Sequence, residues 1–277
     1  MTRLQFSVLM SVYHKEDPLC FKAALQSNLQ EQTLFPDEFV LVCDGPLTAD
    51  LDAVIADYQK RYPDVFKVYR LEQNVGLGKA LKFGLQQCRH EFVARSDSDD
   101  ICASNRFETQ IKFLQENPHI DILGSDISEF ETDPQSPVRW KRMPCTHEEI
   151  AEMAKLRNPI NHMSVMFKKA VVEAVGSYIH LPYVEDYYLW VRALCGGARF
   201  ANIDEFLVSA RVGNGMEKRR SNRAYIGSWK ELNRYMIKHG MLRRGQYIKN
   251  MLLIRAFVYM PSSVKGFVYK YILRKGN

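Results

Sequence analysis

Short apolar runs alternate with longer amphipathic stretches through the first half of the chain. Five apolar runs predict buried strands, at residues 6–12, 38–44, 66–71, 91–96 and 120–126. Between them lie helix-like segments near residues 19–31, 49–61, 77–88 and 103–116. Strands and helices that alternate in this way predict an α/β fold, in which helices flank a doubly wound, mainly parallel sheet.

The pattern changes beyond residue 126. Residues 130–147 are polar and contain three prolines, which predicts a crossing loop. We then expect helices at 147–156, at 170–175 and from about Val184, and strands at 164–169 and near 206–211. From about residue 217 the pattern is helical and basic to the end, so we expect a basic helical C-terminal extension.

Composition narrows the class of protein. The chain has 277 residues and is 46% hydrophobic, which is enough for a substantial core and argues against disorder. Its six cysteines form no CxxC pair, which disfavours a zinc site or a disulfide framework and fits a reducing compartment. The N-terminus lacks the features of a signal peptide, and no apolar stretch is long enough to span a bilayer. We therefore expect a cytoplasmic protein.

The net charge of +6 hides an uneven distribution. Residues 211–277 contain 16 Lys and Arg but only two acids, a local charge of +14 that leaves −8 for the rest of the chain. A basic tail on an acidic body indicates an anionic partner, such as a membrane surface, a nucleic acid or a charged substrate.

The strongest indication of chemistry is the sequence HEFVARSDSDD at residues 90–100. A short apolar strand ends in three carboxylates, Asp97, Asp99 and Asp100. Strand ends of an open α/β sheet are where ligands bind, and crowded carboxylates raise one another's pKa unless a cation lies among them. Mg²⁺ is commonly held by one or two carboxylates plus substrate phosphates. The run therefore predicts a divalent metal and a diphosphate; a solvated acidic loop or a helix cap is the alternative.

Neighbouring residues extend this site. Arg95 directly precedes the acidic run and can pair either with one of its aspartates or with a phosphate. Tyr13 follows the first strand and offers an aromatic ring on which a base can stack. Glu16 lies three residues further on, before Asp17 and Pro18, which predict the start of a helix.

Two further segments belong to the same half of the chain. Asp44 ends the second strand and can either bond the edge of a uracil-type base or shape the turn. Asn74 and Lys79 lie in a glycine-bearing entry to a helix, where backbone N–H groups attract phosphate and Lys79 can neutralise a diphosphate. The phosphate-loop pattern GxxxxGK[ST] fails, because Gln73 and Ala80 occupy required positions, and GxGxxG fails too.

The second half contributes candidate groups of another kind. Glu185 and Asp186 lie at a helix start, where the helix dipole favours acids. A reaction that uses metal and diphosphate also needs a base, and a carboxylate from a later segment can supply it. His162 follows a turn and is either functional or a satisfied structural residue.

Taken in order, these segments resemble the family 2 glycosyltransferases. The resemblance rests on SVLMSVYHKE, VCDGP, NVGLGKALKFGL, ARSDSDD, NHMSVMF and EDYYLWVR, and covers about residues 5–215. It is greatest to the bacterial enzymes that build exopolysaccharide, capsule or lipopolysaccharide repeats, the amylovoran type among them. It implies a GT-A fold over residues 1–215, with a nucleotide-binding half at about 1–125 and an acceptor half at 126–215. The basic helical segment, 216–277, follows.

The resemblance also implies roles for the donor-side residues. Tyr13 and Asp44 would meet the nucleoside base and Asp97 the ribose, while Asp99, with Asp97 beside it, would bind Mg²⁺ or Mn²⁺ on the diphosphate. We place Glu16, Asn74, Lys79 and Arg95 on the same donor side. Two departures concern the second turn, where Cys43 replaces a common acid and Pro46 a common serine. Asp100 falls at a position that varies in the family and is not assigned to the metal.

On the acceptor side, Asp186 would deprotonate the acceptor hydroxyl, with His162 and Glu185 nearby. The family inverts configuration, and the implied reaction moves a sugar from a nucleotide sugar, a UDP-sugar, to a saccharide or lipid-linked saccharide. Two rivals remain. A sugar-phosphate nucleotidyltransferase would show a glycine-rich basic loop where this chain reads SVYHKEDP. A catalytically silent nucleotide-sugar-binding protein would not need Asp97, Asp99 and Asp186.

The basic C-terminal segment adds a partner. Residues 243–275 interleave bases with bulky apolar side chains, and Pro261 divides them into two helices too short to span a bilayer. Basic amphipathic helices of this kind lie in the membrane interface. We expect peripheral contact with the anionic inner face of the plasma membrane and no nucleic-acid partner; a solvated helical cap on the catalytic domain is the alternative.

Overall fold

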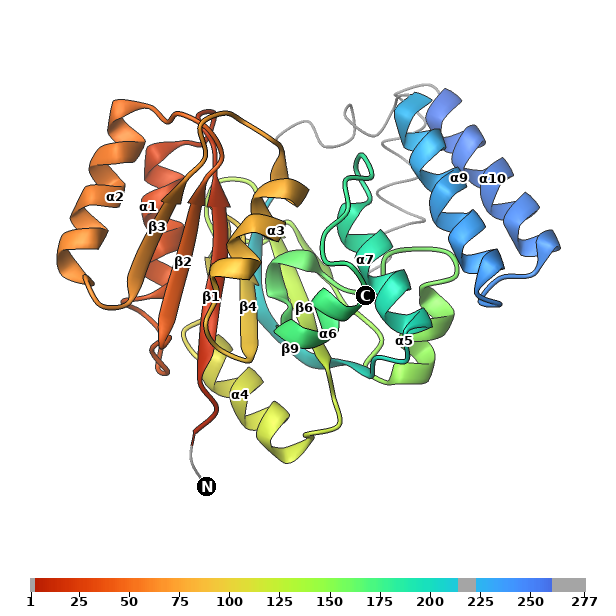
Figure 1. Ribbon diagram of the computed structural model, residues 1–277, viewed down its shortest axis with the longest axis horizontal. Helices are drawn as coiled ribbons and strands as arrows, with labels where there is room; N and C mark the ends of the chain where they lie inside the picture. The colour runs from red at the N-terminus through yellow and green to blue at the C-terminus, as the bar shows by residue number, and fades with distance from the viewer. Residues whose placement is uncertain (1–2, 214–222, 261–277) are drawn as a thin grey trace.

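One mixed sheet runs through the protein, and the two C-terminal helices lie to one side of it (Figure 1). This computed structural model describes residues 3–213 and 223–260. Within them the strands are β1 (Phe6–Val12), β2 (Glu38–Cys43), β3 (Phe66–Arg70), β4 (Phe92–Ser96), β5 (Ile101–Cys102), β6 (Ile122–Phe130), β7 (Arg139–Lys141), β8 (Met166–Lys168) and β9 (Phe200–Arg211). The helices are α1 (Pro18–Asn28), α2 (Ala49–Arg61), α3 (Leu77–Gln87), α4 (Arg106–Glu116), α5 (His147–Met153), η1 (His162–Ser164), α6 (Lys169–Ala174), α7 (Glu185–Cys195), α9 (Arg223–Lys238) and α10 (Arg244–Tyr259).

The first four strands form the parallel part of the sheet, in the order β3-β2-β1-β4. Strands β2 and β4 are buried along their whole length, as expected of parallel strands covered on both faces. The predicted alternation of strand and helix is confirmed here. Helix α1 begins where predicted, because Asp17 caps it by accepting bonds from the Leu19 and Cys20 amides and Pro18 occupies its first turn.

The other part of the sheet is mixed. β8 pairs antiparallel with both β4 and β6, β9 runs parallel to β6, and β5 pairs antiparallel with β9. The predicted crossing loop at 130–147 is partly wrong, because β7 lies within it and pairs with β6. The strand expected near 206–211 begins earlier, at Phe200. The middle of β9 bulges between Ile203 and Phe206 and carries the polar residues Asp204 and Glu205, so it has no continuous apolar pattern. The two-residue strand β5 is too short to be read from periodicity.

Helices cover both faces of the sheet. The side chains of α1, α2 and α4 pack with one face, and those of α3, α5, α6 and α7 with the other. Gly84 of α3 lets that helix lie close to the sheet, because a Cβ there would lie 2.5 Å from Leu9 Cδ1 and 2.6 Å from Val42 Cγ2. Two cores thus share one sheet and fix its strand ends in space.

The C-terminal helices pack on the outer side of α7 (Figure 1). Tyr187 and Val191 of α7 meet Trp229 and Leu232 of α9, and α10 packs against α9. Buried amides join the pair, since Asn250 of α10 donates to Asn233 Oδ1 of α9 at 2.8 Å. A helical C-terminal segment is confirmed for residues 223–259. The predicted second helix beyond Pro261 lies outside the described residues, and no helix among those described is long and apolar enough to cross a membrane.

Candidate active site

The strand order places a crevice between β1 and β4. Connections from β1 proceed to β2 and β3 on one side, and the chain then returns to place β4 on the other side of β1. Ligands of open α/β sheets bind at such a reversal, beyond the carboxyl ends of the strands. Tyr13 follows β1 and Asp97 follows β4, so both predicted residues lie at this edge. Tyr13 is 38% exposed, which leaves its ring accessible.

Asp44 organises the loop beside this crevice. Its carboxylate accepts bonds from the Val75 amide at 2.7 Å and the Gly76 amide at 3.0 Å, and its carbonyl accepts a bond from Asn74 Nδ2. Gly45 has a φ of +87° and a Cβ there would lie 2.6 Å from Asn74 N, so glycine is required. Asp44 and Asn74 therefore shape the entry to α3, and Asp44 is only 3% exposed. Exposed Lys79 lies in the first turn of that helix.

Arg95, which is buried, forms an ion pair with the partly exposed Asp97. Both terminal nitrogens of the Arg95 guanidinium donate to the Asp97 carboxylate, and the arginine is 2% exposed. An aspartate of the acidic run is one of the two partners predicted for Arg95. A bidentate guanidinium fixes the Asp97 carboxylate in orientation as well as in charge. Glu16 joins the first loop to the same run, because Ser98 Oγ donates to Glu16 Oε2.

Asp99 and Asp100 lie where burial and like charge disfavour the ionised form. Burial, followed by the charges of Asp97 and Glu16, raises the pKa of Asp99 to about 7. Burial and the neighbouring aspartates raise the pKa of Asp100 well above its ordinary value. The Asp100 carboxylate accepts a bond from the Arg211 amide at 2.7 Å, which suits a structural role. A bound cation would relieve the crowding of carboxylates around Asp99.

The residues suit a metal ion whose coordination is completed by phosphate oxygens of its substrate. Across residues 3–213 and 223–260, no three His, Cys, Asp or Glu side chains form a ready metal cage. Mg²⁺ rarely uses an all-protein cage and is commonly held by one or two carboxylates with phosphate oxygens. Burial and the charges of Asp97 and Glu16 outweigh those of Arg211 and Arg95 in raising the pKa of Asp99, and such a carboxylate suits a cation shared with a diphosphate.

A buried polar cluster under the acidic run was not anticipated from the sequence. The guanidinium of Arg106, wholly buried in α4, donates to the Arg95 carbonyl at 2.7 Å, to Ser96 Oγ at 2.9 Å and to Cys102 Sγ at 3.0 Å. Asn28 accepts a bond from Ser96 Oγ at 2.7 Å. These bonds hold the strand residues on both sides of Asp97–Asp100. Only the helical periodicity of α4 could have indicated that Arg106 points inward, and an arginine is not expected at a buried position.

Asp186 lies at the start of α7, where its carboxylate has one clear partner. Asn158 Nδ2 donates to Asp186 Oδ2 at 2.6 Å. The neighbouring Glu185 turns toward the first half of the chain, since a Cβ on Gly78 of α3 would lie 3.4 Å from Glu185 Cγ. Burial is the main cause that raises the pKa of Glu185, and His180 Nδ1 lies 3.5 Å from its carboxylate. Asn158 is a second site residue that the sequence did not indicate.

His162 pairs with Tyr178 in the second half of the chain. His162 Nε2 is 3.0 Å from the Tyr178 hydroxyl, and its ring meets Trp190 edge to face. Burial lowers the pKa of His162 well below its usual range, so the ring is neutral near pH 7. Burial, with the charges of Asp186 and Asp97, raises the pKa of the Tyr178 hydroxyl, and the charge of Arg95 opposes this shift.

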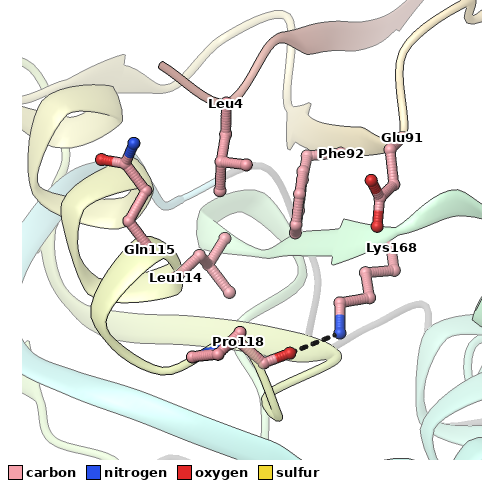
Figure 2. A pocket seen from close by; sticks show the side chains of 7 residues that line it. All are labelled: Leu4, Glu91, Phe92, Leu114, Gln115, Pro118 and Lys168. Carbon is pink, nitrogen blue, oxygen red and sulfur yellow. Dashed lines mark hydrogen bonds between the residues drawn. The ribbon is translucent and has the colours of Figure 1, made fainter. Parts of the chain in front are cut away.

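A separate pocket lies at the opposite end of the sheet. It is lined by Leu4, Glu91, Phe92, Leu114, Gln115, Pro118 and Lys168 and has a volume of about 280 Å³. Figure 2 shows Lys168 donating to the Pro118 carbonyl, at 2.9 Å. Phe92 begins β4 and Asp97 follows its end, so the length of the strand, roughly 16 Å, separates this pocket from the carboxylates. It contributes nothing to the chemistry described above.

Comparisons with known proteins agree with this geometry. The amylovoran biosynthesis glycosyltransferase AmsE of Erwinia amylovora is 41% identical over 268 residues, 96% of this chain and 98% of that protein. The UDP-Gal:alpha-D-GlcNAc-diphosphoundecaprenol beta-1,3-galactosyltransferase of Escherichia coli is 38% identical over 272 residues, 98% of this chain and 97% of that protein.

The fold has solved counterparts. The mannosyltransferase PcManGT from Pyrobaculum calidifontis, solved in complex with GDP-Man and Mn²⁺, superposes with a TM-score of 0.65 at 14% identity and covers all of this chain and 77% of its own. This likeness confirms the predicted glycosyltransferase fold. The model of glycosyl transferase family 2 matches residues 7–174, which include Tyr13, the acidic run and His162. Together with the two relatives, this match shows that the chain belongs to glycosyl transferase family 2.

Proposed function

We propose that this chain moves a sugar from a UDP-sugar to a hydroxyl of a lipid-linked saccharide, with inversion of configuration, during synthesis of a bacterial surface polysaccharide. The observation that carries the proposal is the acidic run at the carboxyl end of β4, where Arg95 bonds Asp97, together with the start of α7, which meets α3 where Glu185 faces Gly78. The name of one relative supports both substrate classes, because it specifies UDP-Gal as donor and a sugar-diphosphoundecaprenol as acceptor.

On the donor side, the exposed Tyr13 ring would stack on the base, with Asp44 at its edge. Each Asp44 oxygen already accepts one amide, and a carboxylate has further lone pairs with which to accept a donor from the base. Asp97, held by Arg95, would contact the ribose, and Lys79 would face the diphosphate. Glu16 and Asn74 would keep the surrounding loops in place.

Asp99, with Asp97 beside it, would hold Mg²⁺ or Mn²⁺. Such a cation supplies Lewis-acid stabilisation of the charge that develops on the leaving diphosphate. The burial of Asp99 among carboxylates supports this role, because its own neighbours disfavour the ionised form. In this proposal Asp100 shapes the loop through the Arg211 amide.

Asp186 would act as the general base. A sugar hydroxyl is a poor nucleophile near neutral pH, so a carboxylate takes its proton as the new bond forms. Glu185 and His162 would line the acceptor side, His162 as a neutral ring bonded to Tyr178. The acceptor oxygen would attack the anomeric carbon from the side opposite the diphosphate, which inverts its configuration.

A direct assay tests the proposed function. The full chain is incubated with UDP-sugars, Mn²⁺ and a synthetic lipid-linked N-acetylglucosamine diphosphate. The expected products are UDP and a glycolipid whose new linkage is β when an α-linked donor is used, as read by NMR. Release of pyrophosphate in place of UDP would identify a nucleotidyltransferase. Donor binding without any transfer, across the whole panel, would identify a silent binding protein.

The proposal includes contact with the anionic inner face of the plasma membrane through α10. The polar face of α9 exposes charged side chains such as Lys230 and Arg234. In contrast, α10 is buried on one side and still exposes large apolar side chains on the other: Ile248 at 57%, Leu252 at 60%, Leu253 at 50% and Tyr259 at 67%. A helix that is apolar on both sides is expected to be buried on both, so the exposed side of α10 needs a partner surface.

The charges on α10 indicate the chemistry of that partner surface. The helix contains no acidic residue, and its bases Arg244, Lys249 and Arg255 are all exposed beside the apolar side chains. Apolar side chains interleaved with bases suit an anionic lipid surface, where each base contributes about 1 kcal/mol, screened by salt. The exposed charges on α9, in contrast, have no exposed large apolar side chains beside them.

Vesicle sedimentation tests this contact. We expect the full chain to pellet with anionic vesicles and the double variant Leu252→Gln, Leu253→Gln to stay largely in the supernatant. Both leucines are exposed, so the fold should survive. The matched control is Lys230→Gln, Arg234→Gln on α9, which removes two charges but no apolar surface. Equal loss of binding in both double variants would show that the contact is not specific to α10, and no binding by the unaltered chain would refute the contact.

A further inference from the structure

The base candidate Asp186 is held by a neutral amide from a distant loop. Asn158 Nδ2 lies 2.6 Å from Asp186 Oδ2, across 28 positions of sequence. Among the residues that the structure describes, no hydrogen-bond donor reaches the other oxygen, Oδ1. One oxygen is thus fixed while the second is left available to accept a proton.

The orientation of the Asn158 amide is determined by its own neighbours. The Ile160 backbone N–H donates to Asn158 Oδ1 at 3.3 Å. Because a backbone N–H can only donate, the oxygen of the amide must face Ile160, and the Nδ2 end must face Asp186. The two bonds together define which way the side chain points.

The loop that carries Asn158 is fixed from several sides. Tyr187, next to Asp186 on α7, donates through its hydroxyl to the Ala154 carbonyl at 2.8 Å. Asn250 of α10 donates to the Lys155 carbonyl at 2.8 Å, and Asn161 donates to the Ser125 carbonyl at 2.9 Å. A loop with these bonds at both ends can hold a side chain in one place.

We propose that Asn158 is a positioning residue for Asp186, an inference that rests on the proposed role of Asp186 as base. Asn158 fixes the plane of the carboxylate so that Oδ1 faces the acceptor hydroxyl. The proton passes from that hydroxyl to Asp186, its oxygen bonds to the anomeric carbon, and the bond to the diphosphate breaks with its electron pair on the leaving group. A neutral donor orients the carboxylate without adding the full positive charge that would weaken it as a base.

A double-mutant cycle tests the proposal. Asn158→Ala should lower kcat about 10- to 100-fold, the scale of a misplaced catalytic group. It should leave the KM for the nucleotide sugar and the affinity for nucleoside diphosphate with Mn²⁺ unchanged. In the background of Asp186→Asn, the same substitution should have almost no further effect on kcat, because the group it positions is gone. Additive losses would overturn the proposal, as would an unchanged kcat in Asn158→Ala.

Two further variants separate positioning from folding. Asn158→Asp keeps the shape and the acceptor for the Ile160 amide but has no N–H, so it should lose at least as much kcat as Asn158→Ala. Asn161→Ala removes an anchor of the same loop without touching Asp186 and should retain kcat within about threefold, even if its melting temperature falls. If Asn161→Ala reproduces the kcat loss, general loop order is responsible and Asn158 has no special role. If Asp186→Asn itself is fully active, the assignment of the base fails, which is a separate result.

Discussion

The two carboxylate sites of this enzyme are built in opposite ways. At the end of β4, carboxylates are crowded with Glu16 nearby, and burial with like charge raises the pKa of Asp99 and Asp100. At the start of α7, the Asp186 carboxylate accepts a bond from the neutral Asn158 amide. The first arrangement suits a cation and the second suits a proton. The contrast supports the proposed division of metal and base chemistry between the two halves of the chain, and four predictions test or sharpen it.

The largest effect is expected at the crowded site. Asp99→Asn should abolish metal-dependent binding of a nucleoside diphosphate, because it removes the carboxylate that would face the cation. Calorimetric titration with and without Mn²⁺ measures this. The matched control is Asp100→Asn, which keeps an oxygen for the Arg211 amide and should retain most of the affinity. Unchanged affinity in Asp99→Asn, or equal loss in both variants, would show that the two carboxylates are not distinguished in this way.

The other site should respond in turnover and not in donor binding. Asp186→Asn keeps the size of the side chain but cannot accept a proton, so kcat should fall roughly 10²-fold or more, the scale of general base catalysis. The affinity for nucleoside diphosphate with Mn²⁺ should remain within about threefold. Steady-state kinetics beside the same titration gives both values. Near-native turnover would transfer the role of base to Glu185 or to another group.

The two halves should also respond to acid with opposite signs. Burial lowers the pKa of His162, so below about pH 6.5 the unfolded chain binds a proton that the folded chain does not, and the free energy of unfolding falls by up to ~1.4 kcal/mol per pH unit. Burial raises the pKa of Asp99 to about 7, so the folded chain retains a proton that the unfolded chain releases above about pH 4. Between these values the free energy of unfolding therefore rises as the pH falls through 7.

Urea denaturation at about pH 7.5 and about pH 5, without metal, separates the two contributions. Relative to the unaltered chain, His162→Gln should gain stability as the pH falls, because it removes the group that destabilises in acid. Asp99→Asn should lose relative stability over the same interval, because it removes the group whose protonation stabilises. Parallel pH profiles for all three proteins would contradict both assignments.

The smallest effect is expected where the halves touch. A Cβ on Gly78 would make only a close van der Waals contact with Glu185 Cγ, at 3.4 Å. Gly78→Ala should therefore raise the free energy of unfolding by up to ~1 kcal/mol through helix propensity and change kcat less than about threefold. The control in the same helix is Gly84→Ala, whose Cβ would collide with Leu9 and Val42 and should destabilise by about 1–3 kcal/mol. Thermal unfolding of both variants measures the difference.

The sequence determined the parts of this protein that depend on neighbouring residues. The alternation of apolar runs predicted β1 to β4 and the helices between them, and Asp17 with Pro18 marked the start of α1. The acidic run at a strand end indicated the donor side, because a short motif contains both the strand and its carboxylates. The basic composition of the C-terminal helices was likewise visible, since composition does not depend on folding.

Only the tertiary structure decided which distant residues meet. It paired Asn158 with Asp186 across 28 positions, placed the Arg106 guanidinium beneath the acidic run, and bonded the Asp44 carboxylate to the Val75 and Gly76 amides. It also distinguished the two basic helices, because α9 buries its large apolar side chains in packing whereas α10 leaves several of them exposed. Periodicity records which side of an element is buried, but contacts between elements are set by packing and strand order, which no local pattern contains.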